Sequence, residues 1–365
     1  MHFDHSRRQF LTHSAVSALS ISGAGTLFSG AVLPISVPLP ISVPSAFPAE
    51  PTALSAAGSV LPQRAAFGMN GTNAQFFIPG LSTDSRILHV TDTHLFLDDE
   101  RGKDFVQYSA RMAAAYHQTA HYMTGKPTGP MESLEAALRF AREKKVDAVA
   151  LTGDILSFPS EAAADWLLER LEKLKADGIP YFFTSGNHDW HYEGWPGSDA
   201  AKREEWIPKR LGKLYPENAD PLAYSVCVKG VRHLFIDDSI YEILPAQLDF
   251  LQKELAFGDP SVVWMHIPPY APGRGVGFGC GHPAWGAGSD RNWEIERRER
   301  WREGGHTQTS FDFYRLLCES PNLLGTFCGH VHSTTLDIVN GKPFVATEAN
   351  ARGAWRLVEF RPMAK

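Results

Sequence analysis

Residues 86–94 read RILHVTDTH, an apolar run that ends in polar side chains. The run from Ile87 to Val90 has the length and composition of a buried strand, and Asp92 and His94 follow it directly. Similar apolar runs recur along the chain at Ala148 to Leu151, Tyr181 to Phe183, Val262 to Met265 and Leu323 to Phe327. Short strands with helices between several of them predict an α/β architecture.

Helical patterns and hairpin turns extend this prediction. Apolar residues recur at spacings of four and three over residues 134–141 and 163–174, which indicates amphipathic helices, and Gly178 stops the second one. Lys229-Gly230 and Asn340-Gly341 each separate two strand-like runs and predict two hairpins. The pattern indicates sheets with at least partly parallel pairing and helices outside.

Each strand-like run ends in, or is followed by, a cluster of Asp, His or Asn. The clusters are Asp92-Thr93-His94, Gly153-Asp154, Gly186-Asn187-His188-Asp189, Met265-His266-Ile267-Pro268 and Gly329-His330-Val331-His332. Ligands of α/β sheets bind at the carboxyl ends of strands, so we expect these clusters to converge. Buried carboxylates brought together repel one another unless cations offset their charge. One such motif arises easily by chance, but five in order indicate a metal site.

Together the clusters resemble the pattern of the calcineurin-like dinuclear metallophosphoesterase superfamily, which is DxH, GD, GNH(D/E), a lone His and GHxH. The resemblance covers residues 86 to 348 and implies a four-layer α/β/β/α sandwich, two mixed β-sheets flanked by helices. It also implies two divalent metal ions. The first would be held by Asp92, His94, Asp154 and His332, and the second by Asp154, Asn187, His266 and His330. The lack of a thiolate favours Mn, Fe, Zn or Co without choosing among them.

The resemblance further implies hydrolysis of phosphate mono- or diesters by a metal-activated water. His188 is not a ligand in the family and is the expected general acid, with Asp189 orienting its ring, although a capping role for Asp189 stays open. Purple acid phosphatases place a Tyr where this chain has Ser157, which disfavours an iron-tyrosinate centre. The alternative substrate is a cyclic or other nucleotide. The alternative class is a non-catalytic metal-binding scaffold.

The N-terminal sequence resembles a twin-arginine export signal. Arg7 and Arg8 precede a stretch, residues 9–49, that contains no Asp, Glu, Lys or Arg. We expect residues 1–57 to be an export signal and a Pro/Ser/Ala-rich linker, and residues 58–365 to be the catalytic domain of a periplasmic or secreted protein. An uncleaved anchor helix is the alternative, but no stable membrane span is expected in the mature form. The expected partners are the export machinery and a phosphate-ester substrate.

The amino-acid composition bears on the expected binding partners and on the state of the cysteines. The formal net charge of −6 excludes an overall field that would hold nucleic acid, so no nucleic-acid partner is expected. The mixed run from Glu294 to Glu303 is expected to be a solvated helix. The four cysteines form no CxxC pair, and Cys227 and Cys328, in apolar strand-like runs, are expected to be buried free thiols.

Two insertions, near residues 98–130 and 271–308, do not fit a minimal core and are expected to cover the site. Their neighbourhood supplies the side chains expected at a substrate rim, which are Trp190, Trp195, Trp285, Trp293 and Arg274. His117 and His121 stand four apart in an expected helix and are interpreted as a polar face rather than a metal pair. The remaining histidines near the motifs could touch phosphate or lie in solvated loops; they are His191, His282 and His306.

Overall fold

The computed structural model describes residues 65–115 and 120–363. These residues belong to one compact unit of the chain, Ser59–Lys365. The expected export signal and linker, and His117, lie outside the described residues. Within the described ranges, no helix combines the length and the apolar character that crossing a membrane requires.

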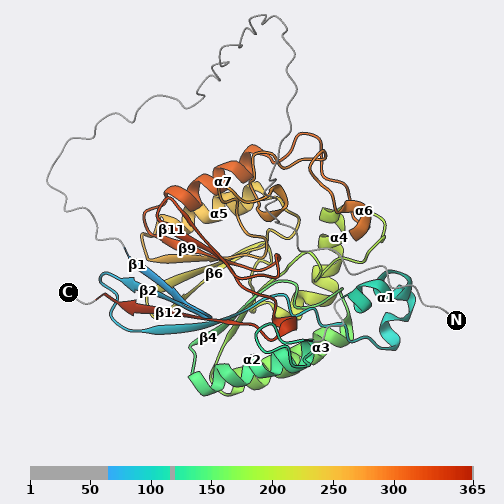
Figure 1. The fold of residues 1–365 in the computed structure, drawn as a ribbon, viewed down its shortest axis with the longest axis horizontal. Coiled ribbons are helices and arrows are strands. Elements are labelled where there is room, and N and C mark those ends of the chain that lie inside the picture. Colours follow the sequence, from blue (N-terminus) through green and yellow to red (C-terminus); the bar gives the residue numbers. More distant parts are fainter. Residues whose placement is uncertain (1–64, 116–119, 364–365) are drawn as a thin grey trace, which may run out of the picture. The chain divides into compact units, whose positions relative to one another are not determined.

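Two six-stranded sheets form the centre of the unit (Figure 1). The strand order of the first sheet is β1 (Ala66–Asn70), β2 (Asn73–Ile78), β12 (Arg356–Pro362), β3 (Ser85–Val90), β4 (Ala148–Thr152) and β5 (Tyr181–Thr184). The order of the second sheet is β10 (Thr335–Val339), β11 (Lys342–Ala346), β9 (Leu323–Cys328), β8 (Ser261–Trp264), β7 (Val231–Ile236) and β6 (Ala223–Val228). All five strands predicted from the apolar runs are present.

Both sheets are mixed. Strands β3, β4 and β5 pair in parallel, and so do β7, β8, β9 and β11. The two predicted hairpins are confirmed, since β6 pairs with β7 and β10 with β11 in antiparallel fashion. Lys229 and Asn340 take left-handed backbone conformations at these turns, with φ of 47° and 49°. Each precedes a glycine of positive φ, the arrangement that a tight two-residue turn requires.

Helices cover the outer face of each sheet and complete the four-layer sandwich that the resemblance implied (Figure 1). Helices α2 (Pro130–Lys144) and α3 (Glu161–Ala176) lie along the first sheet, and α5 (Pro245–Leu255) and α7 (Gln308–Glu319) lie along the second. The other helical segments are η1 (Glu100–Phe105), α1 (Val106–Ala115), α4 (Asp199–Trp206), η2 (Ile207–Leu211), η3 (Gly212–Leu214), η4 (Val276–Phe278), α6 (Trp293–Glu296) and η5 (Asn350–Arg352).

Local sequence explains the helices on the first sheet. The Ser160 side chain caps α3 by accepting from the backbone N–H of Ala163 at 3.2 Å, and α2 begins with Pro130, whose missing N–H costs nothing there. The apolar stripes predicted for both helices are buried against the sheet. Burial of each Leu in these stripes contributes about 1.5–3 kcal/mol.

Aromatic side chains fill the space between the two sheets. Phe76 of the first sheet meets Phe327 of the second with ring centroids 6.1 Å apart, and His89 meets Trp264 at 5.3 Å. All four side chains are buried. Large rings in close contact give a rigid interior. The strand ends that carry the polar clusters are therefore held in fixed positions.

Several local predictions were wrong. The expected helix over Glu294 to Glu303 is reduced to α6, because Arg297 turns the chain in a left-handed conformation with φ of 49°. The Arg298 side chain is only 6% exposed rather than solvated, and its guanidinium lies 2.8 Å from an Asp290 carboxylate oxygen. Cys227 is exposed because β6 is an edge strand, whereas Cys328 is buried as expected.

The described residues of the first insertion include helical segments. The insertion contains η1 and α1, but His121 lies after the end of α1 and not in a helix. The His121 N–H donates to the carbonyl of Lys126 at 2.8 Å, next to an isolated bridge between Ala120 and Pro127. Gly125 permits this turn with φ of 66°. The sequence Gly-Lys-Pro-Thr-Gly-Pro at residues 125–130 is typical of a turn and could have predicted that no helix continues here.

Candidate metal centre

The five polar clusters lie at the carboxyl ends of adjacent strands. Asp92 and His94 follow β3, Asp154 follows β4, and Asn187 follows β5 in the first sheet. In the second sheet the corresponding strands are also neighbours: His266 follows β8, and His330 and His332 follow β9. Because the strands within each set run parallel, their ends meet at one edge of the sandwich.

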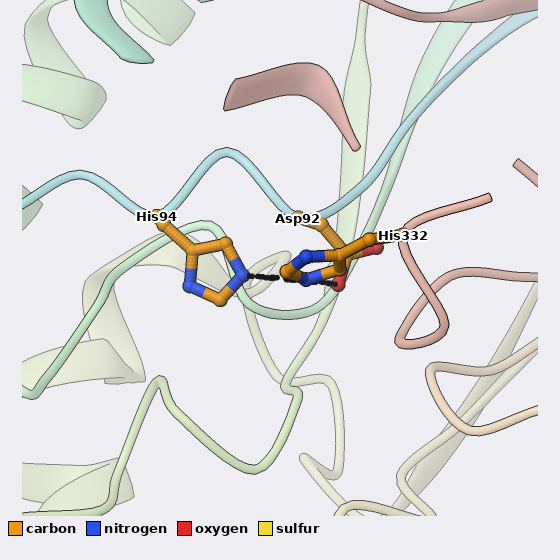
Figure 2. A group of neighbouring side chains, drawn as sticks. All are labelled: Asp92, His94 and His332. Atoms are coloured by element: carbon orange, nitrogen blue, oxygen red, sulfur yellow. Dashed lines mark hydrogen bonds and ion pairs between the residues drawn. The ribbon is translucent and has the colours of Figure 1, made fainter. Parts of the chain in front are cut away.

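Asp92, His94 and His332 form the first of two groups whose ligand atoms lie within 4.8 Å of one another. The His332 Nε2 atom lies 3.1 Å from Asp92 Oδ1 and 3.0 Å from His94 Nε2. Figure 2 shows His332 reaching from its own loop toward Asp92 and His94, which leave the chain segment after β3. One carboxylate and two imidazoles therefore point at a common position.

Asp154, His266 and His330 form the second group. The His266 Nε2 atom lies 3.1 Å from Asp154 Oδ2, and the rings of His266 and His330 are 5.2 Å apart. The same Asp154 Oδ2 atom lies 4.0 Å from His94 Nε2 in the first group. Asp154 is thus the carboxylate that stands between the two groups.

Two further observations test whether these residues suit metal ions. The Asn187 Oδ1 atom is buried and has no hydrogen-bond partner among the described residues, as expected of an oxygen placed to bind a cation. The His266 Nδ1 atom lies 2.9 Å from the carbonyl of Thr152, which leaves Nε2 as the nitrogen for a cation. The complete donor set is two carboxylates, one amide and four imidazoles, which fits divalent ions of hard to borderline character.

The electrostatics of the cluster point the same way. Burial opposes a charge on His266, yet the neighbouring Asp154 carboxylate raises its pKa to about 10. Burial likewise opposes ionisation of Asp92, but His332 holds its pKa at about 2. Both carboxylates therefore favour a positive charge beside them, and divalent cations supply such a charge without protonating the imidazoles.

The backbone at the cluster is strained. Asp92, His94, Asp154, His330 and His332 have positive φ values of 53°, 52°, 51°, 68° and 48°. Left-handed conformations of non-glycine residues cost about 1–3 kcal/mol each and persist where the surroundings impose them. Five of the seven predicted ligands share this feature, which indicates that the fold places them for a function rather than for stability.

The sequence also matches a known protein family. The family model described as calcineurin-like phosphoesterase matches residues 85–334, which is more than half of the chain. The chain belongs to the calcineurin-like phosphoesterase family. Membership supports a metal-dependent hydrolase of phosphoesters, with a dinuclear divalent metal site.

Solved structures resemble the chain at low sequence identity. A dimetal phosphatase from Danio rerio is 13% identical, with a TM-score of 0.45, and the match covers 75% of this chain and 91% of that chain. A purple acid phosphatase from yellow lupin (Lupinus luteus) seeds is 15% identical, with a TM-score of 0.41, and the match covers 77% of this chain and 46% of that chain. No curated protein matches the chain.

Hydrogen bonds from backbone N–H groups hold the predicted ligands of this calcineurin-like phosphoesterase in position. The His330 N–H donates to both oxygens of Asp92, at 3.0 and 2.9 Å, and so ties the first group to the loop after β9. Asp238 Oδ1 accepts from the backbone N–H groups of His266 and Ile267 at 3.0 and 3.1 Å. Asp238 could not be recognised from the sequence, because it belongs to no motif and meets His266 only in the folded chain.

Asp189 contacts the backbone rather than a ring. Its Oδ2 accepts from the N–H groups of Asp154 and Gly186 at 2.8 and 2.7 Å, and its Oδ1 accepts from Leu156 at 2.7 Å. These bonds join the loop after β4 to the loop after β5. The geometry therefore favours the capping role that the sequence left open for Asp189 over the orienting of the His188 ring.

His188 borders the first group. Its ring lies 5.1 Å from the ring of His94, nearly perpendicular to it, and its backbone N–H donates to Asp154 Oδ1 at 2.8 Å. Its side chain is only partly buried, whereas Asn187 beside it is buried. His188 thus lies next to the first group and is partly exposed.

The side chains expected at the substrate rim, and the histidines near the motifs, lie in different surroundings. Trp190 and His191 line a small pocket beside Asn187 and His188. The others make contacts within the fold. Trp195 packs on Trp206, Trp285 is buried, and Arg274 pairs with Asp337 at 3.0 Å. His282 and His306 accept backbone N–H groups within the second insertion. Trp293 lies partly buried in α6.

Ser157 makes a structural contact with the backbone. Its hydroxyl is buried and donates to the backbone carbonyl of His94 at 2.9 Å. It therefore holds the loop after β3 in place.

The same pocket is lined by Tyr241, Glu296 and Arg298, which were not predicted as site residues from the sequence. Tyr241 lies in the loop after β7, between two motifs, and Arg298 lies in the charged run expected to be solvated. No local signal marks either residue. Their positions depend on how residues 271–308 fold back onto the second sheet.

Proposed function

We propose that the chain hydrolyses phosphate mono- or diesters with two divalent metal ions at the centre described above. The observation that carries the proposal is the position of Asp154 Oδ2, which is 3.1 Å from His266 Nε2 and 4.0 Å from His94 Nε2. An ionised carboxylate has several lone pairs on its two oxygens, so one that stands between two ligand groups could serve both ions. An amide or a histidine at this position offers no anionic oxygen.

The proposed ligand sets follow the two groups. Asp92, His94, Asp154 and His332 would hold one ion, and Asp154, Asn187, His266 and His330 would hold the other. Asn187 joins the second set because its buried Oδ1 has no other partner among the described residues. Mn, Fe, Zn and Co all suit oxygen and imidazole donors, and the donor set does not choose among them.

Two divalent ions at such a centre lower the pKa of a bound water and offset charge that develops on the phosphoryl oxygens. The side chains of the protein supply the rest of the chemistry. His188 is placed to donate a proton to the leaving oxygen of the ester, since it borders the first group and is partly exposed. Asp189 keeps His188 in place indirectly, by holding the two loops that carry Asp154 and Asn187.

A nucleotide substrate has no specific support. An open aromatic slot beside the centre would favour a base, but Tyr241 and Trp285 stack on each other at 5.6 Å with an interplanar angle of 14°. Trp301 packs against both rings. These rings thus fill their own space, and the adjoining pocket has mainly polar lining residues.

The test is hydrolysis by the purified protein loaded with Mn or Zn. We expect turnover of a nitrophenyl phosphate monoester or diester together with two metal ions per chain. A non-catalytic scaffold would bind the ions and leave every ester intact. A protein that neither bound metal nor hydrolysed any ester would contradict the proposal as a whole.

We also propose that the chain is exported by the twin-arginine route. The support is the sequence around Arg7 and Arg8, followed by a long stretch without charged side chains. In a bacterial host with this pathway, the full chain should reach the periplasmic fraction and the Arg7→Lys, Arg8→Lys double variant should stay in the cytoplasm. Arg64→Lys is the matched control, and equal export of all three proteins would refute the proposal.

A further inference from the structure

Tyr241 is an unusual residue beside the second ligand group. Its backbone has φ of 60°, a conformation that is a true outlier for a bulky aromatic side chain. Its N–H donates to the carbonyl of Asp238 at 2.8 Å, and Asp238 in turn holds the loop of His266. The strain at Tyr241 therefore belongs to the same framework that places the ligands.

The ring of Tyr241 is held from several sides. Trp285 stacks on it at 5.6 Å and Trp301 meets it edge-on at 5.7 Å. The Arg298 guanidinium carbon lies 5.3 Å from the ring centroid, and Asp290 fixes that guanidinium with two bonds of 2.8 and 3.0 Å. All four of these neighbours come from the second insertion, so holding this ring is one task of residues 271–308.

The hydroxyl of Tyr241 points toward the centre. It lies 3.4 Å from His330 Nε2, the only hydrogen-bond partner of this hydroxyl within the described part of the chain. As with His266, the ring nitrogen that already has a hydrogen-bond partner leaves the other one, Nδ1, for a cation, so the His330 Nε2–H donates to the Tyr241 oxygen. The hydroxyl proton of Tyr241 is then left without an acceptor. A buried donor without an acceptor is unfavourable, so the hydroxyl needs one. The adjoining pocket, which Tyr241 lines with Asn187 and His188, is where that acceptor would lie.

We infer that the Tyr241 hydroxyl donates a hydrogen bond to a phosphoryl oxygen of the substrate, on the side of the second ligand group. A phosphoryl oxygen carries negative charge that grows during hydrolysis, so a fixed donor stabilises it more in the transition state than in the ground state. Trp285, Trp301 and Arg298 are then positioning residues, which act through the ring. This inference rests on the proposed function.

The experiment compares wild-type protein with Tyr241→Phe, which keeps every ring contact and removes only the hydroxyl. Metal content is measured by elemental analysis, and binding of inorganic phosphate to the Mn-loaded protein is measured by calorimetry. We expect Tyr241→Phe to keep two ions per chain, to bind phosphate about 10- to 100-fold more weakly, and to lose kcat by a similar factor. A change of roughly 10- to 100-fold is what the loss of one hydrogen bond to a charged acceptor produces.

Tyr224→Phe is the matched control. Tyr224 is also a buried tyrosine, but its hydroxyl bonds with the backbone N–H and carbonyl of Phe183 at 2.9 and 2.8 Å. Its loss should lower the melting temperature and leave phosphate affinity unchanged. The opposite pattern in the two variants separates a substrate contact from a structural one.

Three results would overturn the inference. Phosphate affinity equal to wild type in Tyr241→Phe would show that the hydroxyl contacts no phosphoryl oxygen. Loss of metal in that variant would show that the hydroxyl acts only through His330. Failure of the Mn-loaded wild-type protein to bind phosphate would exclude a phosphoryl acceptor altogether. A wild-type protein that bound metal and phosphate but hydrolysed no ester would instead refute the proposed function, and the phosphate affinities would still decide the role of Tyr241.

Discussion

Replacement of Gly153 by Ala should disturb the metal centre through a contact with the neighbouring loop. A Cβ atom at this position would lie 2.5 Å from the backbone N of Gly186, 2.6 Å from its Cα and 2.7 Å from His266 Nδ1. No Cβ in a folded protein approaches other atoms so closely, so either the loop before Asn187 or the ring of His266 has to move. Both carry predicted ligands.

The magnitude follows from two contributions. Gly153 has φ of 81°, and a side chain in the left-handed region costs about 1–2 kcal/mol. Forcing a methyl group into a packed site adds about 1–3 kcal/mol. Gly153→Ala should therefore lower the free energy of unfolding by about 2–5 kcal/mol. It should also weaken metal binding, because Asn187 and His266 are displaced.

Gly178→Ala separates the two contributions. Gly178 has nearly the same backbone conformation, with φ of 83°, but no atom lies within 4 Å of a Cβ built there. Denaturant unfolding of the metal-free proteins should show only the backbone cost in Gly178→Ala, and elemental analysis should show its full metal content. If Gly153→Ala were no less stable than Gly178→Ala and bound metal equally well, close approach of the two loops would not be the reason for glycine at Gly153.

Two further predictions concern single histidines. His188→Ala should keep both metal ions and slow turnover by about 10²–10⁴-fold, because it removes only the proton donor; unchanged kcat in steady-state assays would refute the role. Burial lowers the pKa of His233 to about 3, so below its unfolded value of about 6.5 the unfolded chain binds a proton that the folded chain does not. The contribution of His233 to stability should therefore fall between about pH 6.5 and 3 by up to about 1.4 kcal/mol per pH unit. His233→Phe should flatten that acid limb, yet lower stability at pH 7 because Trp264 Nε1 loses an acceptor at 3.0 Å. Denaturant unfolding at pH 7 and pH 4.5 checks both effects, and an acid limb as steep as in the wild type would contradict them.

The framework of the site was predictable because its signals are local. A strand of four or five buried residues followed directly by Asp92 and His94 can be recognised in the sequence, and so can the other four clusters. The carboxyl-end rule for parallel strands then predicts that they meet. The hairpins were predictable for the same reason, since Lys229-Gly230 and Asn340-Gly341 are turn sequences by themselves.

The surroundings of the site were not predictable, because they depend on contacts between distant segments. Tyr241 gains its place from Trp285 and Trp301, some tens of residues away, and from its own left-handed backbone. The side chain of Arg298 is enclosed because Asp290 binds its guanidinium and Tyr241 lies under it. Cys227 was misjudged because an apolar run does not reveal whether its strand lies at the edge of a sheet. Asp189 could be assigned to a backbone role only once the partner amides were located.

The central claim is that Asp154 bridges two metal ions, and the metal content of Asp154→Asn tests it most directly. The substitution keeps the size of the side chain and removes its charge. We predict two ions per chain in the wild-type protein and, in Asp154→Asn, loss of both ions together with activity, while circular dichroism shows the fold retained. Two tightly bound ions in Asp154→Asn would contradict the account.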